Sequence, residues 1–215
     1  MPDLESQRLL DFIGKMPIEE GAVEFFSSKP ESKAYLDKCK NLLPVPFYSR
    51  LPKKDGADTF FGETIKSHDT LPYALLLLRS DIASLKYDFG QVSAEGRGPD
   101  TVCLFQIGSK LNGYRDTTHG GLLASLLDEV VGFNVDGLCS CIEAQSENKP
   151  RTRLYTGYLN TSYRKPVSPG IYAVESRLVK RDGRKWFLKG QVVGTDGTVY
   201  TEAEVLYIQS RDSLL

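Results

Sequence analysis

The residues with the clearest chemical potential form a His-Gly-Gly turn that is followed by an aspartate. His119, Gly120 and Gly121 precede an apolar run typical of a helix, and Asp128 falls within that run. Small residues at a helix start let a ligand approach the first N–H groups, which have no partner inside the helix. The helix dipole adds partial positive charge at the same end. This pattern predicts an oxyanion site at the helix start.

Asp128 is the candidate base or nucleophile that such an oxyanion site would need. It lies among apolar helix residues, where a carboxylate is costly unless it is paired or used. Two simpler interpretations stay open at this point. Asp128 and its neighbour Glu129 can both occupy a solvated helix face, and His119 can be a structural cap of the helix.

The sequence lacks the residues that other hydrolytic mechanisms or a metal site would require. A Ser-His-Asp hydrolase would need a second usable histidine or a Gly-x-Ser-x-Gly turn, but His68 is the only other histidine and no such turn occurs. Cys139 and Cys141 have no second pair or nearby histidines, so a zinc site is not expected. We expect reduced thiols, no metal and no redox cofactor.

Composition narrows the class of protein further. The chain has 215 residues, 40% hydrophobic and 26% charged, with a formal net charge of −1. This is ordinary globular composition without the basic excess of a nucleic-acid binder, and no apolar run approaches the length of a transmembrane helix. The acidic N-terminal stretch fits neither a secretory signal nor a mitochondrial presequence. We therefore expect a cytoplasmic protein.

Glycine and proline residues between positions 90 and 99 predict a division of the chain. We expect residues 1–95 to form a mainly helical extension and residues 96–215 to form the domain that carries the His-Gly-Gly turn. Within the extension, apolar spacing predicts helices over 4–15 and 31–43. A third helix is expected after Asp69-Thr70-Leu71-Pro72, with Leu75–Leu78 as its buried face.

The second part of the chain predicts a sheet with one long helix. Thr101–Ile107 is short, apolar and β-branched, and 120–135 has helical periodicity. Asp182-Gly183 and Asp196-Gly197 are strong hairpin signals between strand candidates. The order predicts an α+β fold in which an antiparallel meander curls around the helix. Its four strands are expected at 153–163, 171–181, 185–195 and 198–208.

The motif resembles a known family. His119-Gly120-Gly121 with Asp128 nine positions after the histidine resembles the hotdog acyl-CoA thioesterases of the phenylacetate-pathway type. The stretches 156–166, 183–187 and 200–203 are similar to the strand regions that follow the helix in that family. Among its members, the sequence looks most like the vertebrate mitochondrial acyl-CoA thioesterases and their fungal relatives. The resemblance covers about residues 100–210, and it makes a mitochondrial location the alternative.

The resemblance implies a hotdog fold and a role for each matching residue. Asp128 is implied as the general base or nucleophile, and the Gly120 N–H as the donor that polarises the thioester carbonyl. Thr156 is implied to help hold the attacking water, and His119 to position the thioester. Many members carry an asparagine six residues before the histidine, where this chain has Gly113 and places Asn112 one position off. Further substrate contacts are expected from Gly121 and Asn160.

An acyl-CoA substrate carries phosphates, so basic residues should line its entrance. Arg164, Lys165, Arg184 and Lys185 are the candidates, with Lys180 and Arg181 beside them. Two other functions stay open. One is a dehydratase or hydratase on the same fold, which the motif fits poorly. The other is a non-catalytic hotdog module that binds acyl groups or a protein partner.

The spacing of the motif predicts a site shared between two chains. Gly120 and Asp128 are eight residues apart, which is about 12 Å along a helix axis. A thioester carbonyl at hydrogen-bonding distance from the Gly120 N–H is then out of reach of the same helix's Asp128. An antiparallel copy of the helix, related by a two-fold axis, can supply the missing carboxylate. We expect a homodimer, or a dimer of dimers.

Overall fold

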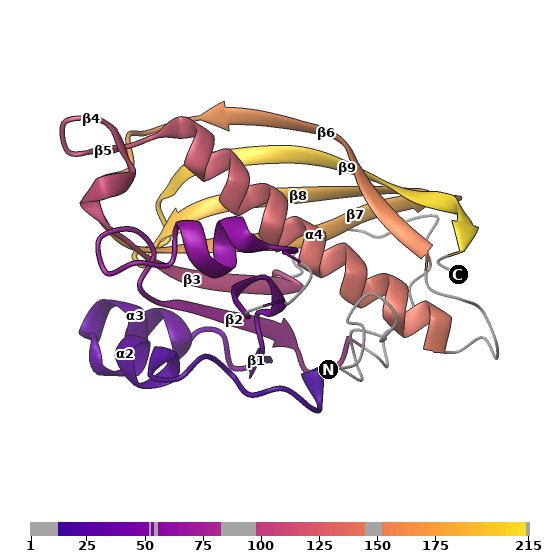
Figure 1. Ribbon diagram of the computed structural model, residues 1–215, viewed down its shortest axis with the longest axis horizontal. Coiled ribbons are helices and arrows are strands. Elements are labelled where there is room, and N and C mark those ends of the chain that lie inside the picture. Colours follow the sequence, from indigo (N-terminus) through magenta and orange to yellow (C-terminus); the bar gives the residue numbers. More distant parts are fainter. Residues whose placement is uncertain (1–12, 52, 54–55, 83–97, 145–151, 214–215) are drawn as a thin grey trace.

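The computed structural model describes residues 13–51, 53, 56–82, 98–144 and 152–213. In this part of the chain, an antiparallel sheet of seven strands curves around one long helix, α4 (Gly120–Ala144), as Figure 1 shows. The strand order is β1-β2-β3-β7-β8-β9-β6. The strands are β1 (Leu42–Val45), β2 (Ala74–Arg79), β3 (Thr101–Ile107), β6 (Thr152–Tyr163), β7 (Gly170–Asp182), β8 (Lys185–Gly194) and β9 (Val199–Ser213).

Short elements precede the first strand and connect the later ones. Helices α2 (Ala22–Ser28) and α3 (Pro30–Leu36) precede β1. A 3₁₀ turn, η1 (Tyr48–Arg50), and a π-helical turn, η2 (Phe60–Thr64), lie between β1 and β2. After β3 come a second 3₁₀ turn and a two-stranded ribbon that leads into α4. They are η3 (Ser109–Leu111), β4 (Asn112–Tyr114) and β5 (Thr117–Thr118).

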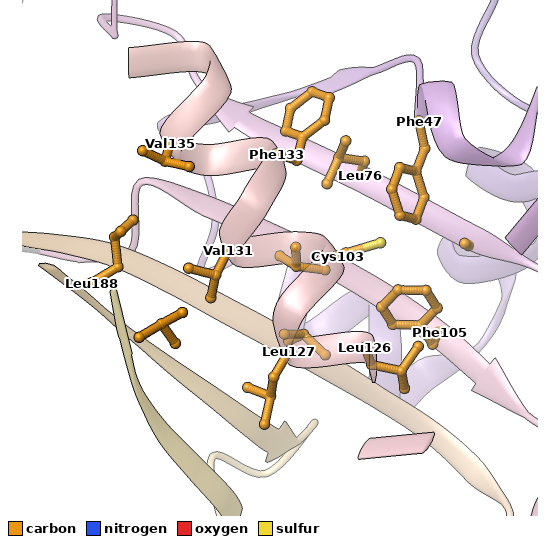
Figure 2. Close-up of a cluster of buried hydrophobic side chains, with 14 of the residues drawn as sticks. Phe47, Leu76, Cys103, Phe105, Leu126, Leu127, Val131, Phe133, Val135 and Leu188 are labelled. Atoms are coloured by element: carbon orange, nitrogen blue, oxygen red, sulfur yellow. The ribbon is translucent and has the colours of Figure 1, made fainter. Parts of the chain in front are cut away.

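Each face of the sheet has its own apolar cover. On one face, α4 packs on the sheet through residues such as Leu126, Leu127 and Val131, which are fully buried. Figure 2 shows these side chains against strands β2, β3 and β8 and against Phe47 of the extension. On the other face, α2 and α3 cover the strands β2, β3 and β7. The sheet is therefore the middle layer of three over this half of its width.

The close approach of α4 to the sheet depends on a glycine in β8. A Cβ built at Gly190 would lie 2.9 Å from Leu127 Cδ2 and 3.0 Å from Val131 Cγ2. Side chains do not tolerate contacts this short in a packed core. The missing side chain at Gly190 therefore sets how closely the helix lies against β8.

The strands after residue 100 agree with the sequence prediction. Strand β3 has the predicted bounds, and β6 to β9 differ from the predicted strands by a few residues at their ends. Gly183 and Gly197 have positive φ angles of 55° and 89°, and they lie in the turns that join β7 to β8 and β8 to β9. Both Asp-Gly hairpins are thus confirmed. The predicted helix is longer than expected, because α4 continues to Ala144.

The order of the strands differs from a simple meander. Strand β6 pairs with β9 at the edge of the sheet, and β7 pairs with β3 instead of with β6. The prediction of a consecutive meander was therefore wrong for β6. Turn signals fix only the pairs that are joined by tight hairpins, whereas the connection from β6 to β7 crosses over the width of the sheet.

The helix predicted around Leu75–Leu78 is a strand, and this prediction was wrong. In β2, Leu75 and Leu77 face the α2 and α3 side, whereas Leu76 and Leu78 face the α4 side. A strand buried on both faces is a continuous apolar run, and such a run has no alternation to distinguish it from a buried helix.

The extension therefore contributes strands as well as helices. The predicted helix over 31–43 ends early, since α3 stops at Leu36 and residues 42–45 form β1. The predicted helix over 4–15 lies almost wholly outside the described residues, as does most of the predicted linker near 90–99. Since β2 pairs with β3 in one sheet, the division at residue 95 stays a prediction. No helix among the described residues is long and apolar enough to cross a bilayer.

Candidate active site

The start of α4 is capped by the histidine that precedes it. The Gly121 N–H donates a hydrogen bond to His119 Nδ1 at 2.9 Å. In this arrangement Nδ1 is the acceptor, so the proton of the neutral ring is on Nε2. A Cβ at Gly121 would lie 2.9 Å from the same nitrogen. The cap interpretation of His119 therefore fits this contact. The expected contact of Gly121 with the substrate stays a prediction.

Gly120 is held from the opposite side by a tyrosine that the sequence reasoning missed. The Tyr163 hydroxyl donates to the Gly120 carbonyl oxygen at 2.9 Å. A Cβ at Gly120 would lie 3.3 Å from the ring of Tyr163. In the described part of the chain, no acceptor is recorded for the Gly120 N–H. This N–H therefore remains available to a ligand at the helix start.

Asp128 is half-buried and held by side chains from two strands. Its Oδ1 accepts a hydrogen bond from the Thr156 hydroxyl of β6 at 3.0 Å. The Tyr207 hydroxyl of β9 lies 2.8 Å from the same Oδ1. Thr156 and Tyr207 are cross-strand partners, and the register of β6 shifts just after Thr156. The pairing of β6 with β9 thus brings both hydroxyls to one carboxylate.

Tyr207 was not among the predicted site residues. Its side chain is only 5% exposed. Burial, and secondarily the charge of Asp128, raises the pKa of the Tyr207 hydroxyl far above its ordinary value. It therefore stays protonated and remains a donor. A usable signal exists in β9, where the buried Thr201, Ala203, Val205 and Tyr207 alternate with the less buried Glu202, Glu204 and Leu206. An inward-facing tyrosine hydroxyl normally needs a partner.

Glu129, the residue after Asp128, does not lie on a solvated helix face, which was one of the interpretations left open by the sequence. Its carboxylate accepts a hydrogen bond from the Ser49 hydroxyl of η1. Burial is the main cause that raises the pKa of Glu129, and the charge of Asp128 adds to it. The turn η1 is itself fixed, because the buried Arg50 forms an ion pair with Glu19 at 2.7 Å and donates to the Leu71 carbonyl. The extension therefore contacts α4 beside Asp128.

The predicted basic residues do not gather in one place within a single chain. Arg164 pairs with Glu202 through a 2.8 Å contact and follows the Tyr163 end of β6. Lys185 is paired in register with Ile208, seven positions along β9 from the partner of Tyr163, which is about 23 Å away. Arg164 and Lys165 thus lie near the Gly120 end, whereas Arg184 and Lys185 lie near the Asp128 end.

Asn160 is separated from Asp128 and the start of α4 by the sheet. It stands opposite Glu204 in the register and lines a surface hollow of about 510 Å³ with Arg164, Lys189 and Glu202. Alternation along β6 places the side chains of Thr161 and Tyr163 on the α4 side and that of Asn160 on the other. Within one chain, Asn160 therefore cannot contact a substrate bound at Asp128.

Two further predicted features can be located. Gly113 packs on the histidine, since a Cβ there would lie 3.0 Å from His119 Cδ2. The neighbouring Asn112 Oδ1 is buried without a hydrogen-bond partner among the described residues. Across the described ranges, no group of three or more histidine, cysteine, aspartate or glutamate side chains is arranged to hold a metal ion.

The fold and this site define a class of protein. A long helix in the concave face of an antiparallel sheet, with the order β3-β7-β8-β9-β6, is the hotdog fold. A search against family models found no match. Among solved structures, the chain is similar to the Escherichia coli PaaI protein of the phenylacetic acid degradation operon. That likeness has 9% identity and a TM-score of 0.45, and it covers 54% of this chain and 75% of PaaI.

Sequence relatives define the family. The chain is 30% identical over 184 residues to the acyl-coenzyme A thioesterase THEM4 of Rattus norvegicus, which covers 81% of this chain and 73% of the rat protein. It is 29% identical over 184 residues to the protein of that name from Bos taurus, with 81% and 70% coverage. The chain therefore belongs to the THEM4 family of acyl-CoA thioesterases.

Proposed function

We propose that this protein hydrolyses acyl-CoA with Asp128 as its base or nucleophile. The observation that carries the proposal is the carboxylate of Asp128, half-buried in the middle of α4 and held on one oxygen by Thr156 and Tyr207. Among the described residues no hydrogen bond reaches its other oxygen, Oδ2. Oδ2 can therefore take a proton from water, or attack the carbonyl carbon itself.

One carboxyl group can both accept and return the proton that the reaction moves. In the general-base route, Oδ2 accepts a proton as the water oxygen bonds to the thioester carbonyl carbon. The Gly120 N–H donates to the carbonyl oxygen as negative charge develops there. The carbon–sulfur bond then breaks, and the protonated carboxyl returns its proton to the leaving thiolate. The products are the free acid and CoA.

The proposal includes a site shared by two chains. Asp128 and Gly120 of one helix are about 12 Å apart, which is too far for both to touch one thioester group. The edge strand β6 supports the pairing, because Tyr155 and Tyr158 on it are 54% and 38% exposed. A long unpaired edge favours pairing with another strand. Two copies of β6 related by a two-fold axis would bring each Asp128 toward the partner's helix start.

The same symmetry supports a place for the CoA phosphates. Arg184 and Lys185 lie at the Asp128 end of the sheet, and Arg164 and Lys165 at the Gly120 end. In a two-fold dimer the two ends meet, so both basic pairs border one site. We propose that Arg184 and Lys185 attract the phosphates, since neither forms an ion pair with another described residue.

The activity is tested by thiol release from a panel of acyl-CoA substrates. Asp128→Asn should lower kcat by about 10²- to 10⁴-fold, the usual contribution of a general base. Asp37→Asn makes the same change at an exposed position and should leave kcat unchanged. Near-normal turnover by folded Asp128→Asn would remove this carboxylate from the mechanism. Consumption of acyl-CoA without thiol release would indicate hydration or dehydration instead.

The shared site is tested by mixing two inactive variants. Asp128→Ala removes the carboxylate, and Gly120→Pro removes the donor N–H. Gly120→Ala is the control, because it meets Tyr163 in the same way but keeps the N–H. If subunits reassort at random, about half the dimers are mixed and each has one complete site, so about a quarter of wild-type activity returns. Verified mixed dimers without recovery would contradict the shared site.

A further inference from the structure

Tyr207 makes the most specific contact to the proposed base, and it lies on β9, the last of the described strands in sequence order. Its hydroxyl oxygen lies 2.8 Å from Asp128 Oδ1 and 2.8 Å from the main-chain carbonyl oxygen of Asp128. The single phenolic proton is thus shared between the side chain and the backbone of one residue. A buried tyrosine hydroxyl normally needs a hydrogen-bond partner, and here both of its acceptors belong to the proposed base.

A missing side chain on α4 makes this contact possible. Gly132 lies one helical turn after Asp128, and a Cβ there would lie 2.8 Å from the Tyr207 hydroxyl. The other two nearest atoms, at 3.4 and 3.8 Å, also belong to Tyr207. Glycine in a helix interior is less favourable than alanine, so this position calls for a packing reason. Tyr207 is therefore the residue whose approach Gly132 allows.

We propose that Tyr207 is a positioning residue for Asp128 and that Gly132 is the gap which admits it to the helix. This inference rests on the proposed function of Asp128. Tyr207 and Thr156 both occupy Oδ1, so the carboxylate cannot rotate freely and Oδ2 is the oxygen that faces the substrate. The hydrogen bond to the backbone carbonyl also ties the orientation of the carboxylate to the helix axis.

Losing the Tyr207 hydroxyl should lower kcat more than it changes KM. A carboxylate that samples other rotamers spends less time aligned with water or thioester, and alignment is what a positioned base contributes. The basic residues proposed to bind the CoA phosphates are unchanged in variants of Tyr207, so substrate affinity should survive. A tyrosine that only filled the core would change stability without this separation of kcat from KM.

Three variants test the inference. Tyr207→Phe removes only the hydroxyl, and Gly132→Ala fills the gap while keeping the hydroxyl. We expect each to lower kcat by about 10- to 100-fold, in line with a lost hydrogen bond to a charged group, and to change KM by less than about threefold. Tyr200→Phe removes a hydroxyl from the same strand away from Asp128, and its kcat should match wild type.

The double variant gives the sharpest result. If Gly132→Ala acts by displacing the hydroxyl, it has nothing left to displace in Tyr207→Phe, so the double variant should be no slower than Tyr207→Phe alone. Fully additive losses would overturn the link between Gly132 and Tyr207. Binding of a non-hydrolysable thioether analogue of acyl-CoA should be unchanged in all variants.

The outcomes separate this inference from the proposed function. Wild-type kcat in Tyr207→Phe, with Asp128→Asn inactive, would overturn the positioning role and leave the base in place. Activity in Asp128→Asn would overturn the proposed function first. If Tyr207→Phe does not fold, Gly132→Ala decides alone, because alanine favours the helix. Its wild-type kcat would then overturn the inference.

Discussion

At the scale of single residues, the two adjacent carboxylates of α4 have opposite surroundings. Asp128 faces the hydroxyls of β6 and β9, whereas Glu129 faces η1 of the extension. Burial raises the pKa of Glu129, so its charged form is disfavoured in the folded protein. Of the groups that face Glu129, the Ser49 hydroxyl and Lys53 favour its charged form, whereas Asp128 opposes it.

The sign of this effect gives a prediction for pH-dependent stability. Because the folded pKa of Glu129 exceeds its unfolded value, the penalty is absent below the unfolded pKa near 4.5 and complete above the folded pKa. Glu129→Gln should therefore gain stability over wild type as pH rises above 4.5. Urea unfolding at several pH values measures the difference. The exposed Glu20→Gln should show no such trend, and a constant difference for Glu129→Gln would contradict the prediction.

Thr156 gives a second prediction at this scale. It donates one hydrogen bond to Asp128 and shares that oxygen with Tyr207. Losing one donor of two should cost less than losing the base, so Thr156→Ala should lower kcat by about 3- to 15-fold. Thr156→Ser keeps the hydroxyl and should retain most of the activity. Equal turnover in Thr156→Ala and wild type, measured by thiol release, would remove Thr156 from the site.

At the scale of elements, the distance between α4 and β8 is set by Gly190. Gly190→Ala would place a methyl group within 3.0 Å of Leu127 and Val131, in the region shown in Figure 2. Overpacking of this kind costs about 1–3 kcal/mol. The free energy of unfolding in urea should fall by that amount. Gly98→Ala adds the same methyl in open space and should be neutral. An unchanged Gly190→Ala would show that the helix can shift away at little cost.

Sequence patterns predicted local elements better than their partners. The turns at Gly183 and Gly197 were legible because a positive φ favours glycine and the strands that they join are neighbours. The pairing of β6 with β9 and the burial of β2 on both faces depend on contacts between distant segments. No local pattern specifies such contacts.

The same limit applies to the candidate site. The His-Gly-Gly turn is at the start of α4 and Asp128 lies within the same helix, so sequence spacing alone relates them. Tyr207, Tyr163 and Ser49 reach this helix from three other elements. Their contacts with α4 depend on how the sheet and the extension pack around the helix. Gly132 is a partial exception, because a glycine in a helix interior already indicates a close neighbour.

At the scale of the whole molecule, the extension is part of the core. Phe47, Phe61 and Leu76 from residues before 95 pack with Phe105 and Phe133 in one apolar cluster. Leu75–Leu78, expected to be the buried face of a helix, instead form an internal strand of the sheet.

This packing predicts that the extension cannot be removed cleanly. Deleting residues 1–95 would strip β1 and β2 from the sheet and expose the edge of β3. We expect the deleted protein to be insoluble or to lack a cooperative thermal transition. Leu76→Ala, a milder change, should cost about 2–5 kcal/mol of stability, whereas Leu43→Ala at a 54% exposed position should cost little. A soluble, cooperatively folding deletion variant would contradict this prediction.

The position of β6 at the end of the strand order also has a consequence for biosynthesis. Strand β6 precedes β7, β8 and β9 in the chain, yet its partner in the sheet is β9. A ribosome that releases the chain from its N-terminus therefore exposes β6, and the apolar face of α4, before the strands that cover them exist. Folds dominated by such distant pairings form slowly and are prone to aggregate while they wait. Chaperone occupancy of the nascent chain should accordingly persist until β9 has emerged.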